Sequence, residues 1–247
     1  MTGKPLDGRI ALVTGASRGI GYQAAKGFAA AGAHVIAVAR TVGGLEELDD
    51  EISRGGGSAT LVPVDLKDMP AIDRLGAAIH ERWGKLDVLL ANAGILGQLS
   101  PLGHIPAKVW DDVMAVNVTA NWRLIRSLDP LLRASDAGRA IFMSSGAAHH
   151  CRPFWGPYSV SKAAVEALAR TYAQEVQSTP IRVVAVDPGR TRTAMRAQAM
   201  PGEDPATLPT PAEIVPYLVE MASPAFSRNN VLFRFPTKTY VEWSEAA

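Results

Sequence analysis

Short apolar runs alternate with longer helix-patterned stretches along most of the chain. The apolar runs read RIALVTG, HVIAVAR, ATLVPVD, LDVLLANAG, RAIFMSS and RVVAVDPG. Runs of this length that are apolar on both faces are typical of parallel strands covered by helices on both sides. Right-handed crossovers between such strands generate a doubly wound sheet. The alternation therefore predicts an α/β fold, a doubly wound parallel sheet with helices on both faces.

The length fits one large domain covering residues 1–247. The chain has 247 residues, 47% of them hydrophobic, and shows no internal repeat or low-complexity linker. One stretch differs: the sequence at about 194–212 is rich in proline and polar residues and has no strand pattern. We expect this segment to be a surface lid near the substrate site.

The charge balance favours a small-molecule partner. Twenty-five basic residues stand against twenty-four acidic ones, a formal net charge of +1, without the basic excess expected for binding to nucleic acid or anionic membranes. No apolar run approaches the roughly 18 residues of a membrane span. A single cysteine, Cys151, and an N-terminus without a secretory signal predict a cytoplasmic protein. No cluster has convincing metal-ligand spacing, so we expect no metal.

The first predicted strand leads into a glycine-rich segment, TGASRGIG at 14–21, followed by a helical pattern. In an open parallel sheet, ligands bind beyond the carboxyl ends of the strands. Glycines at 15, 19 and 21 allow a tight turn, close approach of the backbone to a pyrophosphate, and free helix N-terminal N–H groups facing its charge. The segment predicts a dinucleotide site. The alternative is a turn that only packs a helix on a strand.

The end of the second predicted strand indicates which dinucleotide binds. An acidic residue there would select the ribose 2′-hydroxyl of NAD, but this chain has Arg40 followed by Thr41, and Arg18 lies in the glycine-rich segment. Two guanidinium groups can hold a 2′-phosphate. We therefore predict NADP(H) in preference to NAD(H). The alternative is that both arginines are solvated surface charges.

A tyrosine and a lysine stand four residues apart at the start of a helical pattern, in YSVSK at 158–162. Residues four apart share one face of a helix, so Lys162 projects beside Tyr158. A nearby ammonium group favours the phenolate, as does the positive ring of an oxidised nicotinamide, so we expect Tyr158 to exchange protons closer to neutral pH than an ordinary tyrosine. Tyr158 is then a candidate general acid in reduction and general base in oxidation.

With these motifs in this order, the sequence resembles the short-chain dehydrogenase/reductase family, whose members have a single Rossmann-type domain. The resemblance covers nearly the whole chain up to about Met195. The motifs that carry it are TGASRGIG at 14–21, Asp65, ANAG at 91–94, Asn117, SS at 144–145, YSVSK at 158–162 and DPGRTRT at 187–193.

The resemblance implies roles for four catalytic residues. Tyr158 transfers the proton, and Lys162 also holds the hydroxyls of the nicotinamide ribose. Ser145 ends a predicted strand thirteen positions before Tyr158, the family's separation, and its hydroxyl is placed to donate to the substrate oxygen as charge develops. Asn117 is implied to hold a water that connects Lys162 to solvent.

The resemblance also implies a cofactor site built from several strand exits. Asp65 and Leu66 are placed at the adenine, residues 92–94 under the cofactor, and residues 188–193 at the carboxamide. The full predicted set is Gly15, Ser17, Arg18, Gly19, Ile20, Gly21, Arg40, Thr41, Asp65, Leu66, Asn92, Ala93, Gly94, Tyr158, Lys162, Pro188, Gly189, Thr191 and Thr193.

Other positions depart from the family pattern or lie in the region that contacts substrate. Asp187 stands where the family often has asparagine. The C-terminus lacks the common Asp-Gly-Gly ending, so the resemblance does not predict the last strand. In the family the stretch between Ser145 and Tyr158 lines the substrate pocket. We predict that at least one residue of this stretch touches substrate: His149, His150, Arg152, Phe154 or Trp155. The alternative is an exposed polar loop with a packed tryptophan.

These observations predict an NADP(H)-dependent oxidoreductase that interconverts a small-molecule carbonyl and a secondary alcohol. One alternative is an epimerase or dehydratase that retains its cofactor. Another is a non-catalytic nucleotide-sensing protein of the same fold. Apolar helix faces and the resemblance suggest a homodimer or homotetramer.

Overall fold

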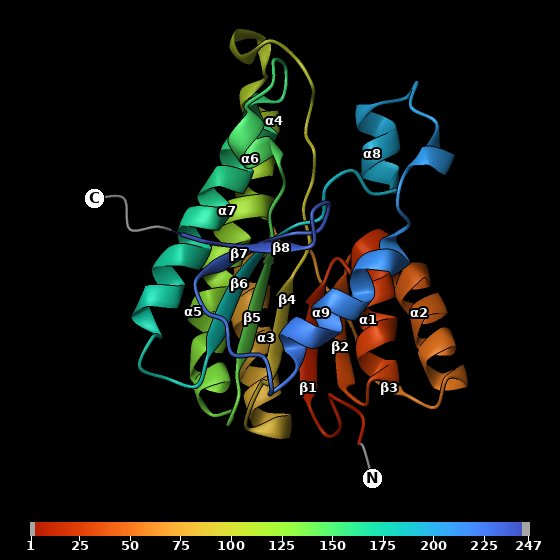
Figure 1. Cartoon of the computed structure of the whole chain (residues 1–247), viewed down its shortest axis with the longest axis vertical. Coiled ribbons are helices and arrows are strands. Elements are labelled where there is room, and N and C mark those ends of the chain that lie inside the picture. Colours follow the sequence, from red (N-terminus) through yellow and green to blue (C-terminus); the bar gives the residue numbers. More distant parts are fainter. Residues whose placement is uncertain (1–2, 244–247) are drawn as a thin grey trace.

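The computed structural model describes residues 3–243 and contains one eight-stranded sheet. The strand order is β3-β2-β1-β4-β5-β6-β7-β8. The strands are β1 (Ile10–Thr14), β2 (His34–Ala39), β3 (Ser58–Pro63), β4 (Val88–Ala91), β5 (Arg139–Met143), β6 (Arg182–Asp187), β7 (Val231–Arg234) and β8 (Thr239–Glu242). Seven strands run parallel, and β8 pairs antiparallel with β7 (Figure 1).

The strand order reverses between β1 and β4, and this reversal locates the binding crevice. From β1 the chain builds outward through β2 and β3, then returns to place β4 on the other side of β1. The connection after β1 leads towards one edge of the sheet, and the connection after β4 leads towards the other edge. A crevice therefore opens beyond the carboxyl ends of β1 and β4.

Helices cover both faces of the sheet, as the sequence predicts (Figure 1). They are α1 (Gly19–Ala30), α2 (Val42–Arg54), α3 (Met69–Trp83), α4 (Ala107–Met114), α5 (Ala120–Arg133), α6 (Ala147–His150), α7 (Gly156–Glu175), α8 (Ala194–Ala199) and α9 (Val215–Ala222). Residues of α1, α2 and α9 pack in one buried cluster, and residues of α3, α5 and α7 pack in the other.

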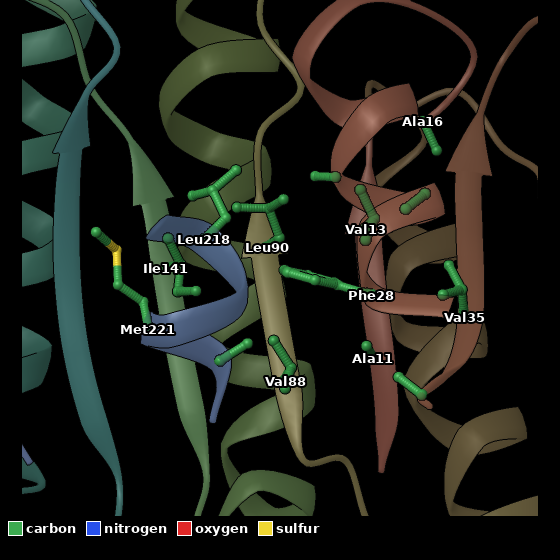
Figure 2. Packing of buried hydrophobic residues seen from close by; sticks show 14 of the residues in the cluster. Ala11, Val13, Ala16, Phe28, Val35, Val88, Leu90, Ile141, Leu218 and Met221 are labelled. Atoms are coloured by element: carbon green, nitrogen blue, oxygen red, sulfur yellow. The ribbon is translucent and has the colours of Figure 1, made fainter. Parts of the chain in front are cut away.

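The first cluster shows how apolar side chains fix the helices against the strands. Phe28 of α1 is fully buried against the sheet, and Leu218 and Met221 of α9 lie beside Ile141 of β5 (Figure 2). Burial of one such side chain contributes roughly 1.5–3 kcal/mol. These contacts hold α1, whose N-terminus faces the crevice, firmly against β1.

The predicted doubly wound α/β fold is confirmed, with one difference at the edge. The prediction had a parallel sheet, whereas β7 turns back through a hairpin into the antiparallel strand β8. A short connection between neighbouring strands enforces this direction, because a parallel partner needs a crossover. The last residues of the atypical C-terminus, 244–247, lie outside the described residues.

The segment expected to be a lid consists of α8 followed by two short 3-10 turns, Pro205–Thr207 and Pro211–Ile214. In Figure 1, α8 stands clear of the helices that cover the sheet. Within this segment, Arg196 of α8 donates two hydrogen bonds to the Glu203 carboxylate, of 2.5 and 2.7 Å. Across residues 3–243 the structure has no helix with the length and hydropathy of a membrane span.

Candidate active site

A cavity of about 890 Å³ lies at the carboxyl ends of the parallel strands. Its wall brings together residues from the exits of β1, β2, β4, β5 and β6 and from α7 and α8. The predicted site residues on this wall are Gly15, Ser17, Arg18, Gly19, Ile20, Arg40, Thr41, Asp65, Leu66, Asn92, Ala93, Gly94, Ser145, Trp155, Tyr158, Lys162, Pro188, Gly189, Thr191 and Thr193. Of the four predicted catalytic residues, only Asn117 is absent from it.

Glycine is required in the loop between β1 and α1 because the backbone there has close neighbours. Gly15 has a φ of +68°, and a Cβ on it would lie 2.9 Å from Asn92 Nδ2. A Cβ on Gly21 would collide with the Gly15 carbonyl oxygen. Gly21 thus serves packing of α1 on the loop, while Gly15 lines the cavity. No side chain caps the N-terminus of α1, so its free N–H groups suit an anionic ligand.

Thr14 ties the exits of β1 and β4 together. Its Oγ1 accepts hydrogen bonds of 3.0 Å from the backbone nitrogens of both Asn92 and Ala93. In return, Asn92 Nδ2 donates to the Thr14 carbonyl at 2.9 Å. These bonds fix the backbone of residues 92–94 at the floor of the crevice, where the sequence predicts a close-approach turn.

The two predicted phosphate-binding arginines are exposed at one end of the cavity. Arg18 immediately precedes α1, and Arg40 immediately follows β2, with 59% of its side chain exposed. Arg40 lies 3.8 Å from Asp65, the residue predicted to meet the adenine. An ion pair this exposed contributes little stability, so Arg40 can exchange Asp65 for a more highly charged anion such as a phosphate.

Tyr158 and Lys162 lie one helical turn apart at the start of α7, and both are buried. Their exposed fractions are 8% and 4%. Lys162 Nζ donates to the Met143 carbonyl at 2.7 Å and lies 5.6 Å from the centroid of the Tyr158 ring. The helical spacing therefore places the ammonium beside the phenol, as predicted.

Burial shifts the pKa values of both groups against ionisation. Desolvation raises the pKa of Tyr158 to about 12, although the neighbouring Ser145 hydroxyl opposes the rise and the Asp187 carboxylate adds to it. Desolvation lowers the pKa of Lys162 to about 8, against the attraction of Glu166. In the protein alone the pKa of Tyr158 is therefore shifted away from neutral pH, because loss of hydration is the largest effect. The shift towards neutral pH expected from Lys162 together with an oxidised nicotinamide stays a prediction.

Ser145 lies two residues after the end of β5 and lines the cavity. The pairing of β5 with β6 continues through Ser144, and this holds Ser145 at the strand exit. The Ser144 nitrogen donates to the Val186 carbonyl at 2.7 Å. Trp155 meets Tyr158 edge to face, with ring centroids 6.0 Å apart. Leu96 and Ala199 of α8 also pack against Tyr158. Apolar side chains, including one from the lid segment, therefore cover the Tyr158 ring.

Asn117 is fully buried in a π-helical turn, Ala115–Thr119, between α4 and α5. Its Oδ1 accepts a hydrogen bond of 2.8 Å from the Ile95 backbone nitrogen. Its Nδ2 donates to the Ile95 carbonyl at 2.9 Å and to the Ser161 hydroxyl at 3.0 Å. The backbone carbonyl of Asn117 accepts a hydrogen bond from Asn121 Nδ2. These contacts hold the segment after β4 against α7. The water relay to Lys162 stays a prediction.

The five residues expected near substrate are divided among different surroundings. Trp155 lines both the large cavity and a neighbouring cavity of about 260 Å³, whereas His150 and Arg152 line only the smaller one. Phe154 is 55% exposed and lines neither cavity. His149 also lines neither, because its Nε2 lies 3.1 Å from the Glu166 carboxylate. The position of His149 therefore gives no support to the predicted contact with substrate.

Glu166 is a buried carboxylate that sequence reasoning missed. It lies one turn after Lys162 on α7, is 5% exposed, and accepts a 2.5 Å hydrogen bond from the Ser144 hydroxyl. Burial raises its pKa, against the bonds from Ser144 and His149, and the like charge of Asp187 raises it further. The spacing from Lys162 was visible in the sequence, but its long-range partners were not.

Replacing Glu166 with glutamine is expected to stabilise the protein progressively as pH rises. The pKa of Glu166 is higher in the folded protein than its ordinary value of 4.5. As pH rises from 4.5 to the folded pKa, the unfolded state releases its proton first, so the free energy of unfolding of the wild-type protein falls. Glutamine can still accept from Ser144 and carries no charge. The difference in Tm between variant and wild type, measured from pH 5 to 9, should grow with pH and then level off. A pH-independent deficit in the variant would contradict this account.

Other cavity residues were not predicted as site residues, although Ser144 and Arg192 lie within motifs of the sequence. Met143, Ser144, Arg192, Met195, Arg196 and Ala199 line the wall through the strand exits and the lid. Within residues 3–243 no group of three histidine, cysteine, aspartate or glutamate side chains is arranged to hold a metal ion. The expectation of a metal-free protein is still a prediction.

Comparison with known proteins identifies the family. The family described as short chain dehydrogenase matches residues 9–204. The uncharacterised oxidoreductase YciK of Escherichia coli K12 is 40% identical over 232 residues, 92% of each chain.

Solved structures agree. A short-chain dehydrogenase of Shigella flexneri complexed with NADP has a TM-score of 0.90 and 38% identity, covering 94% of this chain and 99% of its own. One of Escherichia coli CFT073 complexed with NADPH has a TM-score of 0.88 and 38% identity, covering 95% and 99%. The predicted resemblance is confirmed: this chain belongs to the short-chain dehydrogenase/reductase family and is an NAD(P)-dependent oxidoreductase.

Proposed function

We propose that this enzyme reduces the carbonyl group of a small molecule to a secondary alcohol with NADPH. The observation that carries the proposal is the shared cavity: Ser145, Tyr158 and Lys162 lie on the same wall as the glycine-rich loop and the two arginines. A carbonyl held at Ser145 and Tyr158 is within reach of a cofactor bound along the strand exits.

The loop residues fit a phosphorylated dinucleotide. Gly15, with a φ of +68°, and Gly19, with a φ of +61°, line the cavity and let the loop turn there, and the uncapped N-terminus of α1 offers N–H groups to a pyrophosphate. Arg18 and Arg40 are exposed beside this loop and suit a 2′-phosphate. NADPH, when bound, supplies the hydride. The two structural relatives complexed with NADP or NADPH support this cofactor.

The side chains of the chain supply the proton and hold the substrate oxygen. Ser145 donates a hydrogen bond to the carbonyl oxygen as negative charge develops on it. Tyr158 gives its phenolic proton to that oxygen while the carbonyl carbon accepts the hydride, so that C=O becomes CH–OH. Lys162 stabilises the phenolate that remains and holds the ribose hydroxyls of the cofactor.

The pKa of Tyr158 favours the reductive direction. Burial and Asp187 raise this pKa to about 12 in the protein. The phenol is therefore protonated at neutral pH and is ready to act as an acid. The raised pKa also makes the phenolate left after transfer costly, and this explains why a buried ammonium is needed at Lys162.

The cofactor is tested by titrating the protein with NADPH and NADH, following nicotinamide fluorescence, before and after replacing Arg40 with aspartate. The wild type should bind NADPH more tightly. The variant should weaken NADPH binding at least about tenfold, because a charge-assisted bond is lost and a like charge is introduced. NADH binding should stay the same or improve.

Arg74→Asp serves as the control, since this arginine is 70% exposed on α3 and lines neither cavity. Equal binding of both cofactors, unchanged by Arg40→Asp, would show that the arginines are solvated surface charges. A screen of carbonyl compounds that follows NADPH consumption then separates this reductase from a cofactor-retaining epimerase and from a nucleotide sensor. Neither of these consumes NADPH.

Two further expectations remain part of this proposal. A homodimer or homotetramer is expected, and Trp122 of α5 and Val160 of α7 are exposed apolar side chains, 45% and 43% exposed, on helices at one side of the sheet. A cytoplasmic location is consistent with the single free cysteine, Cys151.

A further inference from the structure

The smaller cavity adjoins the catalytic serine. Its volume is about 260 Å³, and it shares Ser145, Trp155, Gly189 and Arg196 with the large cavity. Ala147, Trp155 and Pro236 provide apolar wall. A substrate whose carbonyl oxygen meets Ser145 can therefore extend its other atoms into this space. The polar groups on the wall then decide which substrates fit.

Asp187 places a buried carboxylate on this wall. It ends β6, next to the Ser144–Val186 pairing, and is 8% exposed. Its Oδ1 accepts the backbone N–H of Gly189 at 2.9 Å. Its Oδ2 receives no hydrogen bond from any described residue and would lie 3.3 Å from a Cβ on Gly146, the residue after Ser145. Asp187 also takes part in no ion pair within residues 3–243.

Ser159 adds a second polar group without a partner. It follows Tyr158 on α7, is 6% exposed and lines the smaller cavity. Its hydroxyl is one of three buried side-chain polar atoms in the described chain that have no hydrogen-bond partner; the others belong to Asn230 and Tyr240. Neither of those two lines a cavity described here. Buried polar groups are nearly always paired, so an unpaired donor at a cavity is available to a ligand.

The positive groups near the cavity are either already paired or largely in solvent. The Arg196 guanidinium makes two hydrogen bonds to Glu203, and Arg190, 74% exposed, lies 3.7 Å from the same carboxylate. Arg152 is exposed. His150 Nδ1 lies 2.5 Å from the Gly146 carbonyl. Solvated charges at a rim discriminate weakly, whereas the side chains of Asp187 and Ser159 are buried.

We propose that the smaller cavity is a substrate subsite that binds a hydroxyl group close to the reacting carbonyl, with Asp187 as acceptor and Ser159 as donor. The proposal rests on the proposed function, since the subsite matters only if Ser145 holds the carbonyl. The substrate class is a hydroxylated ketone or aldehyde, and the apolar wall contacts its carbon skeleton.

A hydroxyl group complements both of these side chains. A hydroxyl can donate to Asp187 and accept from Ser159 at the same time. A purely hydrocarbon arm would displace water from both groups and leave them unpaired, which costs binding free energy. A carboxylate or phosphate arm would face the like charge of Asp187. A site built to pair with a hydroxyl rejects the analogue that lacks it.

The first test compares cyclohexanone with 2-hydroxycyclohexanone as substrates of the NADPH-loaded enzyme. The wild type should prefer the hydroxyketone at least about tenfold in kcat/KM, mainly through KM. Because a hydroxyl also changes intrinsic reactivity, the decisive quantity is the change in this ratio between variants. In Asp187→Asn and in Ser159→Ala the ratio should fall about fivefold or more.

The matched control is Tyr240→Phe, which removes the other unpaired buried hydroxyl, away from either cavity. It should leave the ratio unchanged. A ratio that is the same in wild type, Asp187→Asn and Ser159→Ala would overturn the proposal. Preference for 3-oxocyclohexane-1-carboxylate over both ketones, lost in Arg152→Gln, would also overturn it in favour of an anionic subsite.

A binding measurement separates failure of this proposal from failure of the proposed function. Calorimetric titration of the NADP⁺-loaded enzyme with trans-cyclohexane-1,2-diol and with cyclohexanol needs no turnover. Tighter binding of the diol that is lost in Asp187→Asn supports the subsite even if no ketone is reduced. Reduction of both ketones, with equal binding of diol and monoalcohol, leaves the reductase intact and rejects the subsite.

Discussion

Replacing Tyr158 with phenylalanine is expected to lower kcat for carbonyl reduction by about 10²- to 10⁴-fold. The phenolic oxygen is the proton donor, and phenylalanine keeps the ring that packs against Trp155, Leu96 and Ala199. The fold and the cofactor site should therefore persist. The measurement is single-turnover oxidation of bound NADPH, together with NADPH affinity by fluorescence, which should change little.

Tyr172→Phe on the same helix is a matched control for the loss of a tyrosine hydroxyl. Tyr172 is buried and donates a 2.9 Å hydrogen bond to Asp129, and it lines neither cavity. This variant should lose stability of about 1 kcal/mol while its kcat stays near the wild-type value. Turnover that survives in Tyr158→Phe would refute the proposed mechanism.

Replacing Lys162 with methionine is expected to reduce kcat/KM about 100-fold or more and to weaken NADPH binding. The ammonium that stabilises the Tyr158 phenolate and holds the ribose would be lost, while the apolar stem would still fill the buried space. Because burial lowers the pKa of Lys162 to about 8, the wild-type rate should fall as pH rises through that range. The variant should lack this limb of the pH profile.

The control for charge removal is Lys108→Met on α4. Lys108 is 82% exposed and pairs with Asp112 on the surface, so the variant should keep its rate and its pH profile. A Lys162→Met protein with the wild-type pH profile would show that another group titrates. Glu166→Gln offers a second comparison: it removes the attraction that raises the pKa of Lys162, so the alkaline limb should move to lower pH.

Much of the site could be predicted from local sequence because the relevant distances are set within one element or one strand exit. The loop at 14–21 is formed by neighbouring residues, and the placement of Lys162 beside Tyr158 follows from helical spacing alone. The exits of β1, β2, β4, β5 and β6 meet at one edge simply because these strands are parallel. Local pattern was sufficient in each case.

The ionisation of Tyr158 was not predictable in the same way. Spacing indicates a nearby ammonium, but the pKa depends on how much water the surrounding fold removes. Leu96 from the β4 exit and Ala199 from α8 pack against Tyr158, and burial is the largest cause of its raised pKa. Desolvation is a property of the assembled interior, since residues far apart in the sequence create it.

By itself, the sequence determined the alternation of strands and helices, the glycine-rich loop, the arginines at its side and the Tyr158–Lys162 pair. The tertiary structure alone decided that β8 turns back antiparallel, that His149 contacts Glu166, and that Asp187 lies beside Ser145 in a second cavity. The physical reason is range: periodicity and turns act over a few residues, whereas pairing register and burial join segments tens of residues apart.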